Sequence, residues 1–140
     1  MANEQYAFLN KAQVPSRQAW QAVIDECGFD FQLDPDLKPF EDSGFLPCKF
    51  MGVEGGFEIY CFPAADVAAD FGDIVRGRDF CISFRWGGSM VECACVMIAS
   101  YALARGFDAV VSYEGEEPAE SLEAFLRETQ ECVELAKKDL

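Results

Sequence analysis

The segment from Met90 to Arg105 constrains the fold most strongly, because it is apolar on nearly all of its sides. A helix that faces water carries a polar stripe, so a helix without one is predicted to lie at the centre of the core. Ser89 and Glu92 have the spacing of a capping box, which predicts where this helix begins. Gly106 is expected to end it. The rest of the chain must therefore cover this helix on several sides.

Most of the covering elements are predicted to be strands. Short apolar stretches, several with apolar and polar residues in alternation, lie between turn residues along the chain. Gly55-Gly56 indicates a turn, and Pro47 indicates a strand at an edge or a bulge, because proline cannot donate to a sheet. The expected strands cover residues 29–33, 45–51, 57–62, 79–86 and 108–113.

Two more helices are expected. Ser16 is the expected N-cap of the first and Gly28 its stop, while the second begins with Pro118 at its first position and carries one apolar stripe. Residues 64–75 show a weaker helical pattern, and residues 4–12 are expected to form a short helix or an arm. Residues 1–140 are thus predicted to form one α+β domain, with an antiparallel or mixed sheet of about five strands packed against a buried central helix and an amphipathic C-terminal helix.

The charge composition excludes several classes of function. The chain has 25 acidic residues, 11 basic residues and no histidine, for a formal net charge of −14. Contacts to nucleic-acid phosphates need lysine and arginine, and an anionic membrane repels the same excess of negative charge. The absence of histidine removes the commonest general base and metal ligand. We therefore expect no enzyme activity, no catalytic residues, no cofactor, and neither nucleic acid nor membrane as a partner.

The seven cysteines indicate neither a disulfide framework nor a metal site. Their number is odd, their spacing is irregular, and the closest pair is Cys93-Ala-Cys95. Two residues that are two apart on a helix point to nearly opposite sides, so this pair is poorly placed to chelate a metal. We expect the cysteines to be small core residues. The polar N-terminus lacks the pattern of a signal peptide and the uncharged run Cys93–Ala104 is short for a membrane span, so the expected location is the cytoplasm.

Two acidic segments indicate a binding surface for a basic protein. Residues 25–42 hold seven acidic residues and one lysine, and residues 114–134 hold eight glutamates and one arginine. A solvated surface explains acidic residues in general, but it does not require basic residues to be this scarce. An acidic face attracts a basic partner and restricts the choice of partner. The predicted contact residues are Asp34, Asp36, Phe40, Glu41, Asp42, Tyr113, Glu114, Glu116, Glu117 and Glu120.

Other interpretations stay open at this point. The corner Trp86-Gly87-Gly88-Ser89 leads from a strand into a helix and could receive an anion or a small ligand, although Ser89 and Glu92 are expected to occupy the free backbone donors. Glu58 and Glu92 are the acids with the most apolar neighbours, but Glu58 is predicted on a wet face. Self-association as a homodimer, through a strand edge or the last helix, is a further alternative.

Several short runs between residues 15 and 113 share a layout with one class of bacterial protein. They are Pro15-Ser16-Arg17-Gln18-Ala19-Trp20, Gly28-Phe29-Asp30, Asp34-Pro35-Asp36, Ser43-Gly44-Phe45-Leu46-Pro47-Cys48, Gly56-Phe57-Glu58 and Phe84-Arg85-Trp86-Gly87-Gly88. In this layout the chain resembles small cytosolic immunity proteins that are paired with contact-dependent or type VI secreted toxins. The resemblance implies an acidic, non-enzymatic protein that neutralises a cognate basic toxin by covering its active site. It identifies no specific binding residue.

Overall fold

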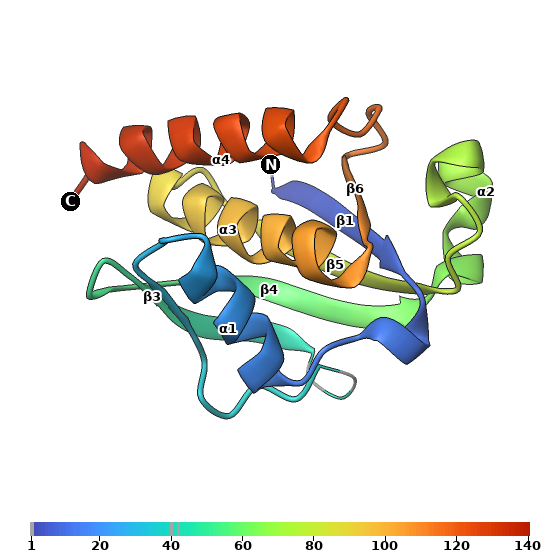
Figure 1. Cartoon of the computed structure of the whole chain (residues 1–140), viewed down its shortest axis with the longest axis horizontal. Helices are drawn as coiled ribbons and strands as arrows, with labels where there is room; N and C mark the ends of the chain where they lie inside the picture. Colours follow the sequence, from blue (N-terminus) through green and yellow to red (C-terminus); the bar gives the residue numbers. More distant parts are fainter. Residues whose placement is uncertain (1, 40, 42) are drawn as a thin grey trace.

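Six strands form one antiparallel sheet in this computed structural model, which describes residues 2–39, 41 and 43–140. The sheet order is β2-β3-β4-β5-β1-β6, and helices cover one of its faces (Figure 1). The chain is a single α+β unit, as the sequence predicted. The strands are β1 (Asn3–Leu9), β2 (Phe31–Leu33), β3 (Gly44–Phe50), β4 (Val53–Pro63), β5 (Phe80–Trp86) and β6 (Val110–Tyr113).

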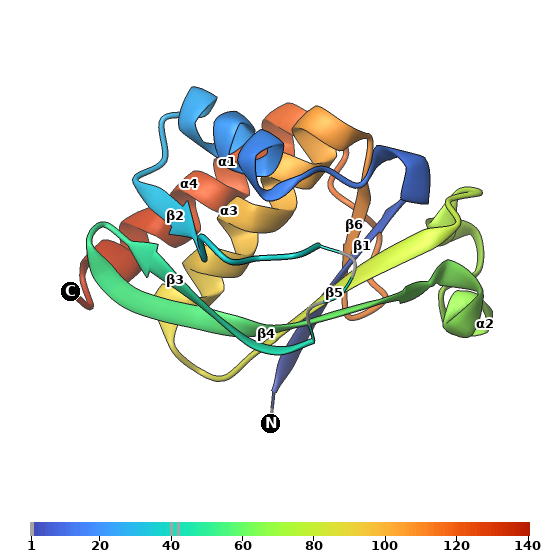
Figure 2. The same cartoon turned by 90° about the horizontal axis from the view of Figure 1, so that it is seen from below.

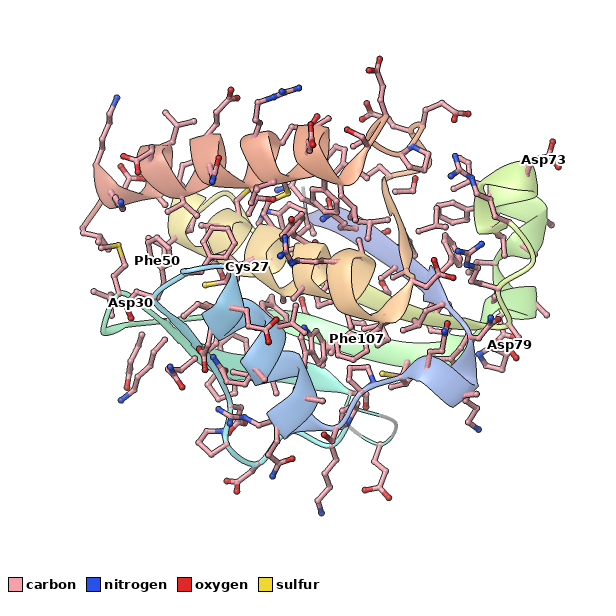
Figure 3. All side chains as sticks on the ribbon, viewed as in Figure 1. Cys27, Asp30, Phe50, Asp73, Asp79 and Phe107 are labelled. Carbon is pink, nitrogen blue, oxygen red and sulfur yellow. The ribbon has the colours of Figure 1, made fainter. Side chains whose placement is uncertain are left out.

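The two faces of the sheet are covered unequally by the described residues. Three helices lie on the first face, while a short segment at residues 64–75 covers one end of the second (Figure 2). Asp73, which belongs to this segment, and Asp30 lie far apart in the molecule (Figure 3). The helices on the first face are α1 (Arg17–Glu26), α3 (Met90–Phe107) and α4 (Leu122–Lys137), and the short elements are η1 (Lys11–Gln13), η2 (Ala64–Asp66), α2 (Ala68–Phe71) and η3 (Gly72–Val75).

The helix α3 occupies the centre of the main core, as its apolar sequence predicted. It packs between α1 and α4 and against the sheet. The Ser89 side chain caps it by accepting a hydrogen bond from the Glu92 backbone N–H. Among the described residues, α3 is the helix that is long and apolar enough to span a membrane, and half of that stretch is buried inside the protein. The core role explains its composition, because every side of α3 has a protein neighbour to pack against.

The expectation of a helix or an arm at residues 4–12 is wrong, because residues 3–9 form the strand β1. This strand lies inside the sheet, between β5 and β6. Its side chains alternate between the faces: Ala7 lies in the main core and Phe8 in a smaller core under residues 64–75. Because both faces are covered here, the strand lacks the apolar–polar alternation of a half-exposed one.

Two glycine predictions are also wrong. Gly55 and Gly56 lie inside β4 instead of in a turn, opposite Cys48 and Pro47 of β3. A Cβ on Gly55 would lie 3.1 Å from the Cys95 Sγ, so the small residue serves packing. Gly106 does not end α3, which runs to Phe107; a Cβ at Gly106 would lie 2.8 Å from a methyl group of Val23 on α1. Glycine is therefore found at both positions because of long-range packing, and not because of a local turn.

The helix starts were predicted with mixed success. Ser16 caps α1 by accepting from the Ala19 N–H, and Gly28 follows that helix with a positive φ of 82°. At α4 the expectation was wrong, because the cap is Ser121, which accepts from the Ala124 N–H, and Pro118 lies in the loop before it. A serine side chain satisfies a free backbone donor, which a proline cannot do, and this fixes the start of the helix.

Candidate functional site

The predicted contact residues of the two acidic segments lie at opposite edges of the sheet. Residues 34–42 follow β2, and residues 114–120 follow β6, which are the two outermost strands. Five strand spacings separate these edges, which corresponds to about 24 Å at about 4.8 Å for each spacing. The structure therefore does not bring the predicted contact residues into one cluster, although Asp30 and Glu134 of the two acidic segments line the same pocket.

The segment after β2 has few contacts that would hold its acidic side chains. Asp34 is half-buried, and its Oδ1 accepts a hydrogen bond from the Asp36 N–H at 3.1 Å. Asp36 and Glu41 are exposed. The predicted contact residues Phe40 and Asp42 lie outside the described residues.

The segment after β6 is tied firmly to the sheet. The Tyr113 ring packs against Trp86, and its hydroxyl donates to Asn3 Oδ1 at 2.8 Å. A carboxylate oxygen of Glu114 accepts from the Glu4 backbone N–H at 3.2 Å. The acidic turn, which we define as residues 114–117, is closed by a bond from the Ser112 hydroxyl to the Glu116 carbonyl oxygen at 2.7 Å. The side chains of Glu116, Glu117 and Glu120 are exposed.

The structure adds a surface that the sequence did not single out as a group. The described residues leave the second face of the sheet uncovered beyond the 64–75 segment. The register places Glu58 of β4 opposite Arg85 of β5, and Arg85 opposite Glu4 of β1. We call the polar surface that these strands share with the start of the acidic turn the open face. Its residues are Glu4, Tyr6, Glu58, Tyr60, Arg85 and Glu114; the Tyr6 ring marks its boundary, because it packs against Phe71 of the 64–75 segment.

Each of the two inner carboxylates of the open face holds a tyrosine. The Tyr60 hydroxyl donates to Glu58 Oε1 at 2.6 Å, and the Tyr6 hydroxyl donates to Glu4 Oε2 at 2.6 Å. The bond to Glu58 raises the pKa of Tyr60 above its ordinary value. Burial, the bond to Glu4 and the Glu4 charge raise the pKa of Tyr6. Both phenols therefore stay protonated at neutral pH and hold the carboxylates in fixed positions.

Arg85 is the cationic centre of the open face. Its side chain is exposed and forms no ion pair with any residue that the structure describes. Glu4 and Glu58 lie on either side of this guanidinium in the strand register, and the carboxylate of Glu114 lies beyond Glu4. The surface is thus negative overall, with one positive charge at a defined position.

An exposed aromatic residue stands at the margin of the open face. Phe45 of β3 lies opposite Glu58 and has 64% of its surface exposed. Its ring lies over Gly56, where a Cβ would collide with the ring. The glycine therefore lets an aromatic side chain lie flat on the sheet while its outer surface stays in contact with water.

Sequence reasoning placed parts of this surface correctly. It predicted Glu58 on a wet face, and this is confirmed. It missed Glu4 and Tyr6 because residues 4–12 were not recognised as a strand, and it did not single out Tyr60 although the strand at residues 57–62 was predicted. The signal that could have found them is a repeated Glu-x-Tyr spacing, Glu4-Gln5-Tyr6 and Glu58-Ile59-Tyr60, which puts acid and phenol on the same side of a strand.

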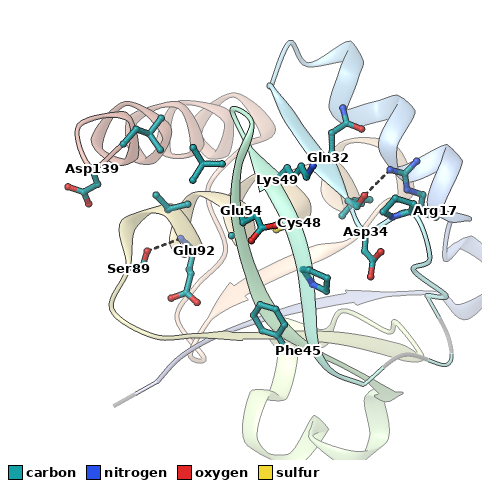
Figure 4. A pocket seen from close by; sticks show the side chains of 17 residues that line it. Arg17, Gln32, Asp34, Phe45, Cys48, Lys49, Glu54, Ser89, Glu92 and Asp139 are labelled. Carbon is teal, nitrogen blue, oxygen red and sulfur yellow. Dashed lines mark hydrogen bonds between the residues drawn. The ribbon is translucent and has the colours of Figure 1, made fainter.

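The alternative site at Trp86–Ser89 opens onto a groove with a volume of about 990 Å³. Figure 4 shows this groove divided by the β3–β4 hairpin, with Ser89, Glu92 and Asp139 on one side and Arg17, Gln32 and Asp34 on the other. The Glu92 carboxylate lies beside the turn, near Gly87. An anion is therefore disfavoured there, and the polar groups of the groove do not converge on one point.

No cluster of three or more cysteine, aspartate or glutamate side chains suited to a metal ion occurs in the described part of the chain. Comparisons with family models, curated proteins and solved structures found no match for the chain. The function is therefore argued from the geometry of the open face and the acidic turn.

Proposed function

We propose that this protein binds a basic protein partner through the open face and the acidic turn, and that it acts as an immunity or inhibitor protein against a bacterial toxin. The observation that carries the proposal is the pair of carboxylates, Glu4 and Glu58, on either side of Arg85, with Glu114 next to Glu4, on an uncovered part of the sheet. The exposed ring of Phe45 beside Glu58 adds an apolar contact.

The charges of the open face favour a basic partner and a defined orientation. Three carboxylates against one guanidinium attract positive charge, and the chain as a whole carries −14. Such complementarity accelerates association and restricts the choice of partner. Arg85 repels any cationic group that is placed over β5, so the partner's cations must align with the carboxylates on the neighbouring strands.

The open face is also rigid before binding, which reduces the entropy cost of association. Five of its six side chains come from β1, β4 and β5, which lie in the interior of a six-stranded sheet. Two of the carboxylates are fixed by the phenols of Tyr6 and Tyr60. Aromatic rings at this site contribute contact area, as such residues do at the centres of many protein interfaces.

A toxin that acts on an anionic substrate has a basic active site, and this gives the inhibition its mechanism. A negative protein surface replaces the charge of the substrate and covers the site. This part of the proposal rests on the charge of the open face and on the resemblance to immunity proteins, and it requires no chemistry by this protein.

The test is a binding measurement with the purified product of the neighbouring gene, at low and high salt. The variant Glu58→Lys is compared with Glu128→Lys, which makes the same charge change at an exposed position of α4, in the helical layer. We expect Glu58→Lys to weaken binding at least about tenfold and Glu128→Lys to change it little, because the contact lies on the open face. High salt should weaken binding by the wild-type protein.

A survival assay then tests the toxin part of the proposal. Cells that produce the partner should be protected by the wild-type protein and by Glu128→Lys, but poorly by Glu58→Lys. Equal effects of the two variants would show that net charge, not the open face, matters. Binding without protection would refute the immunity role. A homodimer of the wild-type protein in light scattering that Glu58→Lys dissociates would refute the interface, because the open face would then be covered by a second copy.

A further inference from the structure

Two pairs of cysteines flank α3 on different sides. Cys93 faces α4, where the thiol of Cys132 donates to the Cys93 sulfur at an Sγ–Sγ distance of 3.3 Å. Cys95, two residues further along, faces the sheet, with its sulfur beside Gly55 of β4 and near Cys48 of β3. The opposite directions follow from the helical spacing. The two pairs therefore lie on different sides of α3.

We propose that Cys93 and Cys132 form a reversible disulfide when the protein meets a peroxide, and that this bond fastens α4 to α3. The proposal is independent of the binding function, because neither cysteine lies on the open face. It is a modification site for an oxidant of the hydroperoxide class.

The geometry favours this pair above the other cysteines. A disulfide needs the two sulfurs about 2.05 Å apart, so an approach of little more than 1 Å from 3.3 Å is sufficient. Cys93 is half-buried, whereas Cys48 and Cys95 are both buried. A small oxidant therefore reaches Cys93 more easily than it reaches the pair on the sheet side.

The surroundings also assign a role to each sulfur. Cys93 lies at the start of α3, where its backbone N–H donates to the Ser89 carbonyl oxygen, and a helix N-terminus stabilises a thiolate. The bond from Cys132 lowers the pKa of the Cys93 thiol, and the same bond together with burial raises the pKa of Cys132. Cys93 is the attacking sulfur and Cys132 the resolving one.

The reaction balances with one peroxide molecule. The Cys93 thiolate attacks a peroxide oxygen, the O–O bond breaks, and a sulfenic acid forms as hydroxide leaves and takes up a proton. The Cys132 sulfur then attacks the Cys93 sulfur, the S–O bond breaks, and the departing hydroxide takes the Cys132 proton as water. Two thiols are oxidised to a disulfide while the peroxide is reduced to water, and a dithiol reductant reverses the linkage by exchange.

The bond would close a loop of 39 residues that contains β6 and the acidic turn. A crosslink over such a loop restricts the unfolded chain, so the oxidised protein should melt about 10 °C higher than the reduced protein. Reduction should reverse this shift. The crosslink also holds both ends of the segment that carries the acidic turn.

The test treats fully reduced protein with a small molar excess of hydrogen peroxide and maps its tryptic peptides without reduction. We expect a peptide that joins Cys93 to Cys132. Because Cys95 lies in the same tryptic peptide as Cys93, the matched control is Cys95→Ser, which should keep the linkage. Cys93→Ser and Cys132→Ala should lose it, with circular dichroism verifying that each variant is folded.

Three results would overturn the proposal. The first is a linkage that persists in Cys93→Ser, which would assign the crosslink to Cys95. The second is irreversible oxidation of Cys93 without a linked peptide. The third is a linked pair at other cysteines that forms as fast as the Cys93–Cys132 bond in the wild-type protein.

Discussion

Gln21 of α1 seals the edge of the sheet, and its replacement gives a sharp test of the fold. The strand β2 is an outermost strand, so its outer backbone groups have no strand partner. The Gln21 side chain supplies one: its Nε2 donates to the Phe31 carbonyl oxygen at 2.7 Å, and its Oε1 accepts from the Leu33 N–H at 2.8 Å. The amide side chain thus acts as a short piece of neighbouring strand.

The burial of these groups determines how much stability the replacement of Gln21 is expected to cost. Gln21 has 6% of its surface exposed, Phe31 0% and Leu33 1%. In Gln21→Ala a buried N–H and a buried C=O lose their partners, and each such loss costs about 1–3 kcal/mol. Water that enters the vacated space recovers part of this. We therefore expect the free energy of unfolding to fall by about 2–4 kcal/mol, a large share of the stability of an ordinary domain.

Urea unfolding of wild type, Gln21→Ala and Gln18→Ala measures this difference. Gln18 is exposed on the same helix, so its replacement should change the unfolding free energy by less than about 0.5 kcal/mol. Hydrogen exchange adds a local readout, because the Leu33 amide should exchange faster in Gln21→Ala. A loss below about 1 kcal/mol, or unchanged exchange at Leu33, would refute the sealing role.

Two further measurements test the buried polar groups and the open face. Ser100→Ala removes the hydroxyl that accepts from Gln5 Nε2 at 2.7 Å in the core, so urea unfolding should show a loss of about 1–3 kcal/mol; an unchanged midpoint would contradict this. The raised pKa of Tyr6 means that the unfolded chain releases the phenol proton first as the pH rises, so its stabilisation is present below pH 10 and declines above it. Between pH 9 and pH 11, the free energy of unfolding should therefore fall less in Tyr6→Phe than in the wild-type protein. Identical pH profiles of the two proteins would show that Tyr6 does not contribute to the pH dependence of stability.

Local signals explain which parts of the fold were predictable. The caps at Ser16 and Ser89 and the stop at Gly28 depend on neighbouring backbone groups, so the sequence alone contains their cause. The apolar residues on nearly all sides of α3 likewise predicted that this helix lies at the centre of the core. By contrast, Gly55 and Gly106 are small because Cys95 and Val23 pack against them from distant elements, and this information is not local.

The open face was less predictable because three strands and the turn after β6 assemble it. Glu58, Arg85 and Glu4 come together through the strand order, in which the first strand is inserted between the fifth and the sixth. A single sequence shows charge and alternation, but it does not show which strands are neighbours. The sequence alone therefore identified the two acidic segments by their composition. The positions of Glu4 and Glu58 opposite Arg85 could be recognised only from the register of the strands.

The same register separates the stability of the sheet from the chemistry of the open face. Phe57, Ile59 and Phe84 lie in the main core, on the other side of the sheet from Glu58 and Arg85. A slip of one residue would turn these aromatic and aliphatic side chains to water and push the charged ones into the core, so the apolar side fixes the register. The charges of the open face are thus free to change without unfolding the sheet. A binding defect in Glu58→Lys, with unchanged stability, would therefore report on the contact itself.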